Sequence, residues 1–250
     1  MLMAAGALLG AIFGSFIATI AIRWPQGRSV ARGRSACDHC GATLGPGRLV
    51  PLLSYVAQRG RAACCGGRID PIHPLTEVMA AVVGAASAAA APDLPQSVAG
   101  AAFGWILLAL AMIDTRHFWL PDRLTATLAA VGLLAGMAGI PPGLSDRLAG
   151  GLSGFALLAL VRLGYRRLRG REGMGGGDAK LFGAIGLWLG WRALPLVLFG
   201  AALAGLAWAL LLMIAGRRLH AASRLPFGPF LALAGWAVWI VPFLWPWSGF

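Results

Sequence analysis

Two acidic residues at the edges of apolar segments are the strongest candidates for chemistry. Asp114 ends the run WILLALAMID, and Asp178 follows the glycine-rich stretch GMGGG at the start of another apolar segment. Acids within or at the edge of membrane spans are costly and usually functional. Two neighbouring carboxyl groups share a proton, so the ionised one removes a proton from water while the other donates to a peptide carbonyl. This chemistry is that of an aspartyl peptidase.

Several neighbours of these acids are candidates for supporting roles. Gly175 to Gly177 lack a Cβ, so we expect them to take unusual dihedral angles and to lie close to a substrate strand. Lys180 and Asp122 are further supporting candidates, although Asp122 in LPDRLT is predicted mainly as a helix N-cap.

The two acids also have purely structural interpretations. Asp178 is a candidate N-cap of its own helix, and Asp114 is a candidate ion-pair partner of Arg116. Glu77 follows Pro74 closely, and it is either a carboxylate favoured near a helix N-terminus or a site residue.

All four cysteines lie in one long polar connection. Cys37 and Cys40 form CDHCG, and Cys64 and Cys65 lie in ACCGG. A reducing cytoplasm disfavours disulfides, and Cys-x2-Cys-Gly is typical of a zinc knuckle. A matching second half would need a cysteine at Ala62. We therefore predict a structural zinc held by Cys37, Cys40 and Cys65, with Cys64 as the fourth ligand; the alternative is free thiols in a small loop fold.

The elements that must position these residues are predicted to be membrane helices. The 250 residues are 58% hydrophobic and 12% charged, which is typical of an all-α polytopic membrane protein. A spanning helix needs about 20 apolar residues. The sequence offers about eight such segments: 3–22, 75–92, 96–114, 123–141, 148–165, 180–191, 194–215 and 228–247. We predict a first transmembrane helix at 1–23, a cytoplasmic cysteine-containing loop at 24–73 and a seven-helix membrane domain at 74–250.

The distribution of basic residues predicts the orientation. If residue 1 lies outside, all of the 21 lysines and arginines except Arg147 and Arg192 fall on the inner side. Membrane proteins concentrate Lys and Arg in cytoplasmic loops. This pattern explains the formal net charge of +12 without a nucleic-acid partner, and it indicates lipid as the surroundings. It places Asp114 and Asp178 together at the cytoplasmic ends of their helices.

Other hydrolase motifs are missing from the sequence. It contains no His-Glu-x-x-His zinc-protease motif and no Gly-x-Ser-x-Gly elbow, and GMGGGDAK lacks the Gly-Lys-Ser/Thr ending of a phosphate-binding loop. The first apolar run precedes its first positive charge, Arg23, so it is predicted to remain as an anchor rather than to be a cleaved signal.

The order and spacing of these segments resemble those of the type IV prepilin peptidases, membrane aspartyl proteases of the Gly-x-Gly-Asp class. IDTRHFWLPDRLT (113–125) and GGGDAK (175–180) resemble the two catalytic motifs. The resemblance covers nearly the whole chain and includes FGSFIATIAIRWP, LVPLLSYVAQRGR, CCGGRI, HPLTE and LPFGPFLALAG. Ala18, Arg48 and Ala62 depart from the usual family residues.

The resemblance implies a catalytic pair, Asp114 and Asp178, that cuts the basic leader from type IV prepilin or pseudopilin precursors. The site would face the cytoplasm at the bacterial inner membrane, in the service of a type IV pilus or of protein secretion. Many members then N-methylate the new amino terminus with S-adenosylmethionine, for which the region near Arg59, Arg61 and Glu77 is the candidate site. The alternatives are a peptidase without methylation, a non-catalytic scaffold of a pilus or secretion system and, more remotely, a transporter.

Overall fold

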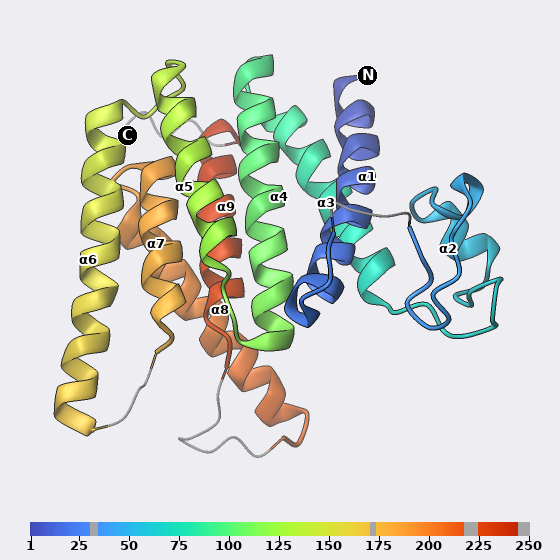
Figure 1. Ribbon diagram of the computed structural model, residues 1–250. Coiled ribbons are helices and arrows are strands. Elements are labelled where there is room, and N and C mark those ends of the chain that lie inside the picture. The colour runs from blue at the N-terminus through green and yellow to red at the C-terminus, as the bar shows by residue number, and fades with distance from the viewer. Residues whose placement is uncertain (31–34, 171–173, 218–224, 245–250) are drawn as a thin grey trace. The chain divides into compact units, whose positions relative to one another are not determined.

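The computed structural model describes residues 1–30, 35–170, 174–217 and 225–244 (Figure 1). In this part the chain is helical: α1 (Leu2–Arg23), α2 (Leu53–Ala57), α3 (Ile72–Ala90), α4 (Leu94–His117), α5 (Asp122–Met137), α6 (Leu144–Arg169), α7 (Gly176–Leu189), α8 (Leu194–Ile214) and α9 (Gly228–Leu244). Some predicted features lie outside the described residues, namely the end of the eighth span (245–247) and the inner-side residues Arg32, Arg34, Arg171, Arg218 and Arg224.

Each of the eight predicted spans coincides with a helix, which confirms an all-α polytopic membrane protein. Five helices are long and apolar enough to cross a bilayer by themselves: α1, α3, α4, α6 and α8. The other three, α5, α7 and α9, have 16, 14 and 17 residues. The shortest, α7, packs against α5, α6 and α9, and a helix enclosed by other helices does not have to match the bilayer thickness alone.

The chain divides into two compact units, Met1–Ala90 and Ala91–Phe250. The first unit groups α3 with α1, whereas the predicted boundary at residue 74 assigned that helix to the following domain. The reason is a glycine stripe on α1, formed by Gly6, Gly10 and Gly14. A Cβ at Gly10 would overlap the carbonyl oxygen of Ala80 on α3, and the other two glycines make similar approaches. Small residues at this spacing allow two membrane helices to pack backbone to backbone.

The second unit is built around α7. Gly150 on α6 and Gly186 on α7 face each other so closely that a Cβ on either would overlap the carbonyl oxygen of the other. On another side, the ring of Trp188 stacks on Phe103 of α4 with a centroid separation of 4.7 Å and meets Trp239 of α9 edge-on at 5.8 Å. Its indole N–H donates to the Leu128 carbonyl of α5 at 2.7 Å. The C-terminal end of α7 is therefore positioned by contacts with four neighbouring helices.

Arg147 does not lie in an outer loop, as the charge pattern predicted. It belongs to the first turn of α6, and its side chain is fully buried. Its guanidinium donates five hydrogen bonds of 2.8–3.1 Å to the backbone carbonyls of Gly132, Ile140, Pro141, Pro142 and Leu187. These carbonyls belong to the last turns of α5 and α7 and to the α5–α6 connection. Arg147 therefore joins these three segments in the protein interior, and it is not an exception to the concentration of basic residues on one side.

Candidate active site and metal centre

Asp114 lies in the last turn of α4, and its side chain is buried, with 5% exposed. The helix ends at Phe118, whose φ of 50° turns the chain away. The carboxylate accepts the backbone N–H of Gly228 at 3.1 Å, a partner that the sequence did not suggest. A Cβ at Gly228 would lie 2.6 Å from the same oxygen, so a glycine is required there. The first residue of α9 is therefore fixed on Asp114.

Asp178 lies in the first turn of α7 and is also buried, with 7% exposed. It is not the N-cap, because that position is Gly175. The carboxylate instead accepts the backbone N–H of Gly175, the N-cap residue three positions earlier. An acidic side chain that reaches back in this way is half of a capping box, and the positive end of the helix dipole favours its charge.

The structure brings Asp114 and Asp178 together, although 64 positions separate them. The end of α4 and the starts of α7 and α9 lie on the same side of the second unit (Figure 1). The side chain of Leu120 connects them, because a Cβ at Gly177 would lie 2.8 Å from it and a Cβ at Gly228 3.4 Å from it. The two carboxyl groups are close enough to interact electrostatically. This is the arrangement that an aspartate pair needs.

The glycines before Asp178 have a different role from the one predicted. The backbone of Gly175 is extended, Gly176 and Gly177 are already helical, and none of the three has a positive φ. What they require is space: a Cβ at Gly176 would lie 2.8 Å from Nη1 of Arg162, and one at Gly177 would press on Leu120. They allow close packing around the carboxylates rather than an unusual backbone conformation.

The other two supporting candidates, Lys180 and Asp122, form an ion pair. The ammonium of Lys180 on α7 lies 2.6 Å from the carboxylate of Asp122 on α5. Asp122 is the first residue of α5 and makes no capping bond, because the N-cap is Pro121, so the predicted capping role is wrong. Both side chains are largely exposed, and such a pair contributes about 0–1 kcal/mol.

Glu77 does not lie near a helix N-terminus as predicted. It occupies the second turn of α3, is 6% exposed, and accepts the backbone N–H of Leu52 at 2.8 Å. Leu52 has a φ of 60°, so this bond holds an unusual backbone conformation at the start of α2. Arg59 follows α2 with a φ of 50°, and Arg61 forms an isolated bridge with Arg68. Among the described residues, no hydrogen bond joins Glu77 to either arginine of the predicted donor region.

The cysteines lie in two turns of matching construction. In the first turn, Cys37 donates its N–H to Ala42 and Gly41 donates to Cys37; in the second, Ala62 donates to Gly67 and Gly66 donates to Ala62. Each turn closes with an isolated bridge and a glycine of φ near 70°. Position 62 therefore corresponds to position 37, and position 65 to position 40. The missing cysteine of the second turn is at Ala62.

The adjacent Cys64 supplies the fourth sulfur. The four Sγ atoms all lie within 4.8 Å of one another, with Cys37 to Cys65 at 3.9 Å and Cys40 to Cys64 at 3.5 Å. Four thiolates at about 2.3 Å around one tetrahedral ion are about 3.8 Å apart. The pKa of Cys37 is lowered to about 6, chiefly because the backbone N–H of Cys40 stabilises its thiolate. The spacing of the four sulfur atoms is therefore compatible with one bound metal ion.

Comparison with known proteins identifies the family of the chain. Residues 101–210 match the model of the type IV leader peptidase family, and residues 8–91 match the bacterial peptidase A24 N-terminal domain. A prepilin leader peptidase/N-methyltransferase of Dickeya chrysanthemi is 37% identical over 96% of this chain and 93% of its own length. The chain belongs to the type IV leader peptidase family. Proteins of the same name from Aeromonas hydrophila and Pseudomonas aeruginosa are 38% and 36% identical over 81% of this chain and cover 70% and 69% of their own length.

No solved structure matches this leader peptidase. The two family matches nevertheless divide where the structure does: one falls almost wholly within the unit Met1–Ala90 and the other within Ala91–Phe250. The cysteine cluster belongs to the N-terminal match and the aspartate pair to the peptidase match.

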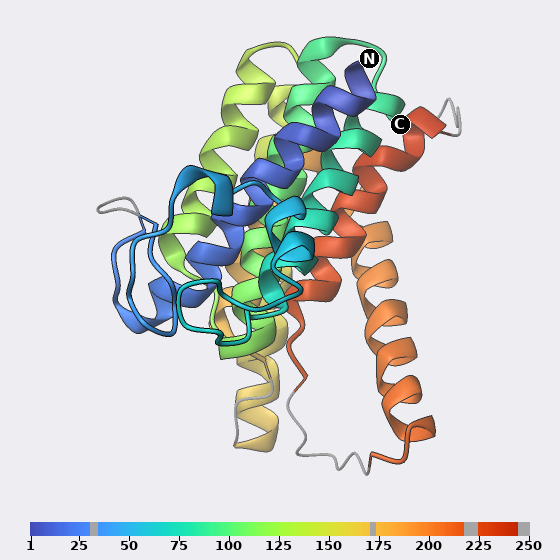
Figure 2. The same ribbon diagram turned by 90° about the vertical axis from the view of Figure 1, so that its right-hand side faces the viewer.

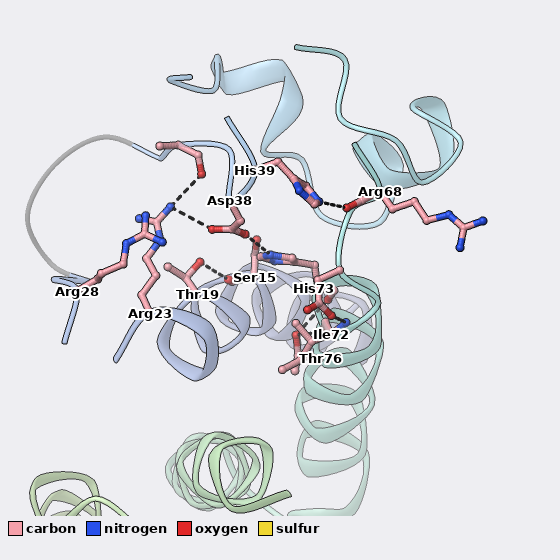
Figure 3. Close-up of polar contacts among 12 residues, drawn as sticks. Ser15, Thr19, Arg23, Arg28, Asp38, His39, Arg68, Ile72, His73 and Thr76 are labelled. Atoms are coloured by element: carbon pink, nitrogen blue, oxygen red, sulfur yellow. Dashed lines mark hydrogen bonds and ion pairs between the residues drawn. The ribbon is translucent and has the colours of Figure 1, made fainter. Parts of the chain in front are cut away.

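One polar cluster beside the cysteines was missed by sequence reasoning. Asp38 lies between two of the cysteines, and its carboxylate is 3.2 Å from His73 Nε2 and 3.8 Å from Arg23 Nη2 (Figure 3). The hydrogen bond from His73 is the main cause that lowers the pKa of Asp38. Arg23 also donates to the Ala36 carbonyl at 2.9 Å. These contacts tie the first cysteine turn to the end of α1 and the start of α3.

Proposed function

We propose that this chain is an aspartyl endopeptidase of the membrane that removes the leader from type IV prepilin or pseudopilin precursors. The observation that carries the proposal is the meeting of two buried carboxylates, Asp114 and Asp178, at the ends of two membrane helices. The names of its relatives give the substrate class, prepilin, and the reaction, leader cleavage.

The two carboxyl groups share one proton between them in this proposal. The ionised carboxylate removes a proton from a water molecule, whose oxygen attacks the carbonyl carbon of the scissile bond. The protonated carboxyl donates its proton to the carbonyl oxygen. The resulting tetrahedral intermediate collapses, the C–N bond breaks, and the departing amine takes up a proton. The N–H groups of Gly175 and Gly228 each bind one of the two carboxyl groups and would hold them in place for this reaction.

The active site is proposed to face the cytoplasm in the bacterial inner membrane. The support is the distribution of basic residues, which is stronger now that Arg147 belongs to the protein interior. Arg192 is then the single basic residue in an outer connection. This orientation gives the cytoplasmic, basic part of a precursor direct access to the pair.

The N-terminal unit is proposed to hold a structural zinc ion and to serve the second activity. The support for zinc is the spacing of the four sulfur atoms of Cys37, Cys40, Cys64 and Cys65. A loop of this size has little apolar core, so a metal would contribute much of its folding free energy.

Methylation of the new amino terminus with S-adenosylmethionine is proposed from the names of the relatives. Methyl transfer needs a deprotonated amine held in line with the donor, which is a task of orientation rather than of acid chemistry. Arg59 and Arg61 remain the candidates for contact with the donor, while Glu77 shapes the region through Leu52.

A single assay tests the proposed function. The purified protein is incubated with a precursor pilin, with and without S-adenosylmethionine, and the product is followed by mass spectrometry. Loss of the leader in both samples and an added methyl group only with the donor is the expected result. Cleavage without methylation would show a peptidase that does not methylate its product. An intact precursor in both samples would contradict the proposal and favour a non-catalytic scaffold.

A further inference from the structure

The N-terminal unit carries an apolar surface that none of the proposed activities uses. Four residues form this surface, which we name the α2 apolar face: Leu49, Val50, Leu53 and Val56. Their exposed fractions are 39%, 43%, 70% and 71%. A loop in water rarely leaves four neighbouring large apolar side chains uncovered, and such a patch marks a contact with a partner or with lipid.

The depth of this face within the unit identifies what covers it. Leu52, directly before α2, is bonded to Glu77 in the second turn of α3, and Glu77 in turn packs against Gly14 of α1. Gly14 precedes Arg23, the last residue of α1, by nine residues. At about 1.5 Å per residue this is about 14 Å along the helix. The start of α2 therefore lies beside the apolar part of the α1–α3 pair rather than beyond its end.

The ribbon agrees with this contact. In Figures 1 and 2, which share a vertical axis, α2 lies alongside the α1–α3 pair, not past the lower end of α1. The helices α1 and α3 are themselves long and apolar enough to cross a bilayer. A segment held beside them at that height would lie at the level of the membrane.

The polar groups around the face fit a membrane boundary. The exposed Arg48 precedes the apolar residues, and the exposed Arg59 follows them. A short helix with an apolar face and cationic flanks binds at the boundary between acyl chains and anionic headgroups. At the start of α2, the backbone N–H of Leu52 would lack an acceptor in lipid. The buried carboxylate of Glu77 accepts that N–H and so removes this cost.

We propose that the α2 apolar face inserts into the bilayer, so that the cysteine loop is bound to the membrane surface by α2 as well as by α1 and α3. The partner of this face is lipid rather than a substrate helix. The hydrogen bond from Leu52 to Glu77 holds the face at membrane depth even when no substrate is bound. This inference concerns membrane contact and does not depend on the catalytic proposal.

The test uses the full chain in nanodiscs of mixed neutral and anionic lipid, with a fluorescent noncanonical amino acid at position 53 and, in a second variant, at position 56. The same residue at Leu9, an exposed position of α1, is the lipid control, and at Thr43, exposed in the first cysteine turn, the water control. Brominated lipid should quench positions 53 and 56 at least half as strongly as position 9, while aqueous iodide quenches position 43 alone.

Three outcomes contradict the proposal. Iodide quenching at positions 53 and 56 would place the face in water. Protection from both quenchers would place it against protein. Protection that appears only when a precursor pilin is added would assign the face to the substrate.

The bond to Glu77 gives a second measurement. Glu77→Leu removes the acceptor for the Leu52 N–H, so lipid quenching at position 53 should fall at least twofold. Glu77→Gln keeps a carbonyl acceptor and should retain it. Unchanged quenching in Glu77→Leu would show that this contact does not set the depth of α2.

Discussion

At the residue scale, the candidate active site depends on glycines that allow neighbouring segments to pack closely around the two carboxylates. Sequence alone identified Asp114 and Asp178, because acids are scarce and both lie at an edge of an apolar segment. It did not identify Gly228, 114 positions from Asp114, because the contact exists only when α9 returns to α4. The expectation of unusual dihedral angles at the glycines before Asp178 was also wrong, because a glycine needed for close packing looks the same in a sequence as a glycine needed for its dihedral angles.

Gly228 provides a residue-scale test. In Gly228→Ala, the new Cβ would lie 2.6 Å from the Asp114 carboxylate, so the pair must shift. We expect the rate of leader cleavage to fall by about 10–100-fold, the size of effect that a small displacement of a catalytic group has. The matched control is Gly164→Ala on α6, where a Cβ meets nothing within 4 Å and helix propensity improves. Full activity in Gly228→Ala would mean that the position of Asp114 is not set by this contact.

The cysteine cluster offers a second residue-scale prediction. We expect about one zinc ion per chain in protein purified without chelator, and a large loss of zinc in Cys64→Ser, since three thiolates and no fourth ligand remain. The double variant Ala62→Cys with Cys64→Ser restores the Cys-x2-Cys-Gly pattern of the first turn and should restore zinc. Elemental analysis decides: zinc absent from the wild type, or unchanged in Cys64→Ser, contradicts the assignment.

At the element scale, helix existence was predictable and helix packing was not. Apolar runs predict the eight long helices because each must satisfy its backbone within itself in lipid. The grouping of α3 with α1 depends on a glycine stripe that is readable only when its partner is known. Arg147 was misjudged for a similar reason: the sequence shows a charge near a turn, whereas its role depends on five carbonyls from three segments that meet only in the folded protein.

Arg147 therefore gives the element-scale prediction. Lys keeps the positive charge but has three donors instead of five, so Arg147→Lys leaves at least two buried carbonyls unsatisfied. We expect a loss of about 2–5 kcal/mol in the free energy of unfolding, measured by denaturation in detergent. Arg192→Lys is the control, because that arginine is exposed and only stacks on Trp191 at 5.6 Å; its cost should stay below about 1 kcal/mol. Equal stabilities of the two variants would show that the hydrogen bonds of Arg147 do not stabilise the fold.

At the scale of the whole molecule, the division into two units suggests a division of labour. The unit Met1–Ala90 holds the cysteine cluster, and the unit Ala91–Phe250 holds both carboxylates. The topology that we predict from the basic residues places the two carboxylates on one side of the membrane, and the assignment of each activity to a unit is our proposal.

This division predicts separable losses. Cys37→Ser with Cys40→Ser should reduce methylation of a pre-cut pilin at least tenfold more than it reduces leader cleavage. Asp114→Asn should block cleavage and still methylate the pre-cut pilin. Both products are followed by mass spectrometry on one preparation of each variant. Parallel loss of both activities in either variant would show that the units do not act separately.

The central claim is that Asp114 and Asp178 together cut the precursor, and the most direct measurement is the rate of leader release by Asp114→Asn, Asp178→Asn and the double variant. Asn keeps the size of the side chain but cannot share a proton. Asp93→Asn on the far end of α4 is the control, because Asn caps a helix as well as Asp does. Each single variant should lose at least about 1,000-fold in rate, the double variant should lose no more than that, and the control should retain its activity. Normal cleavage by either single variant would contradict the account.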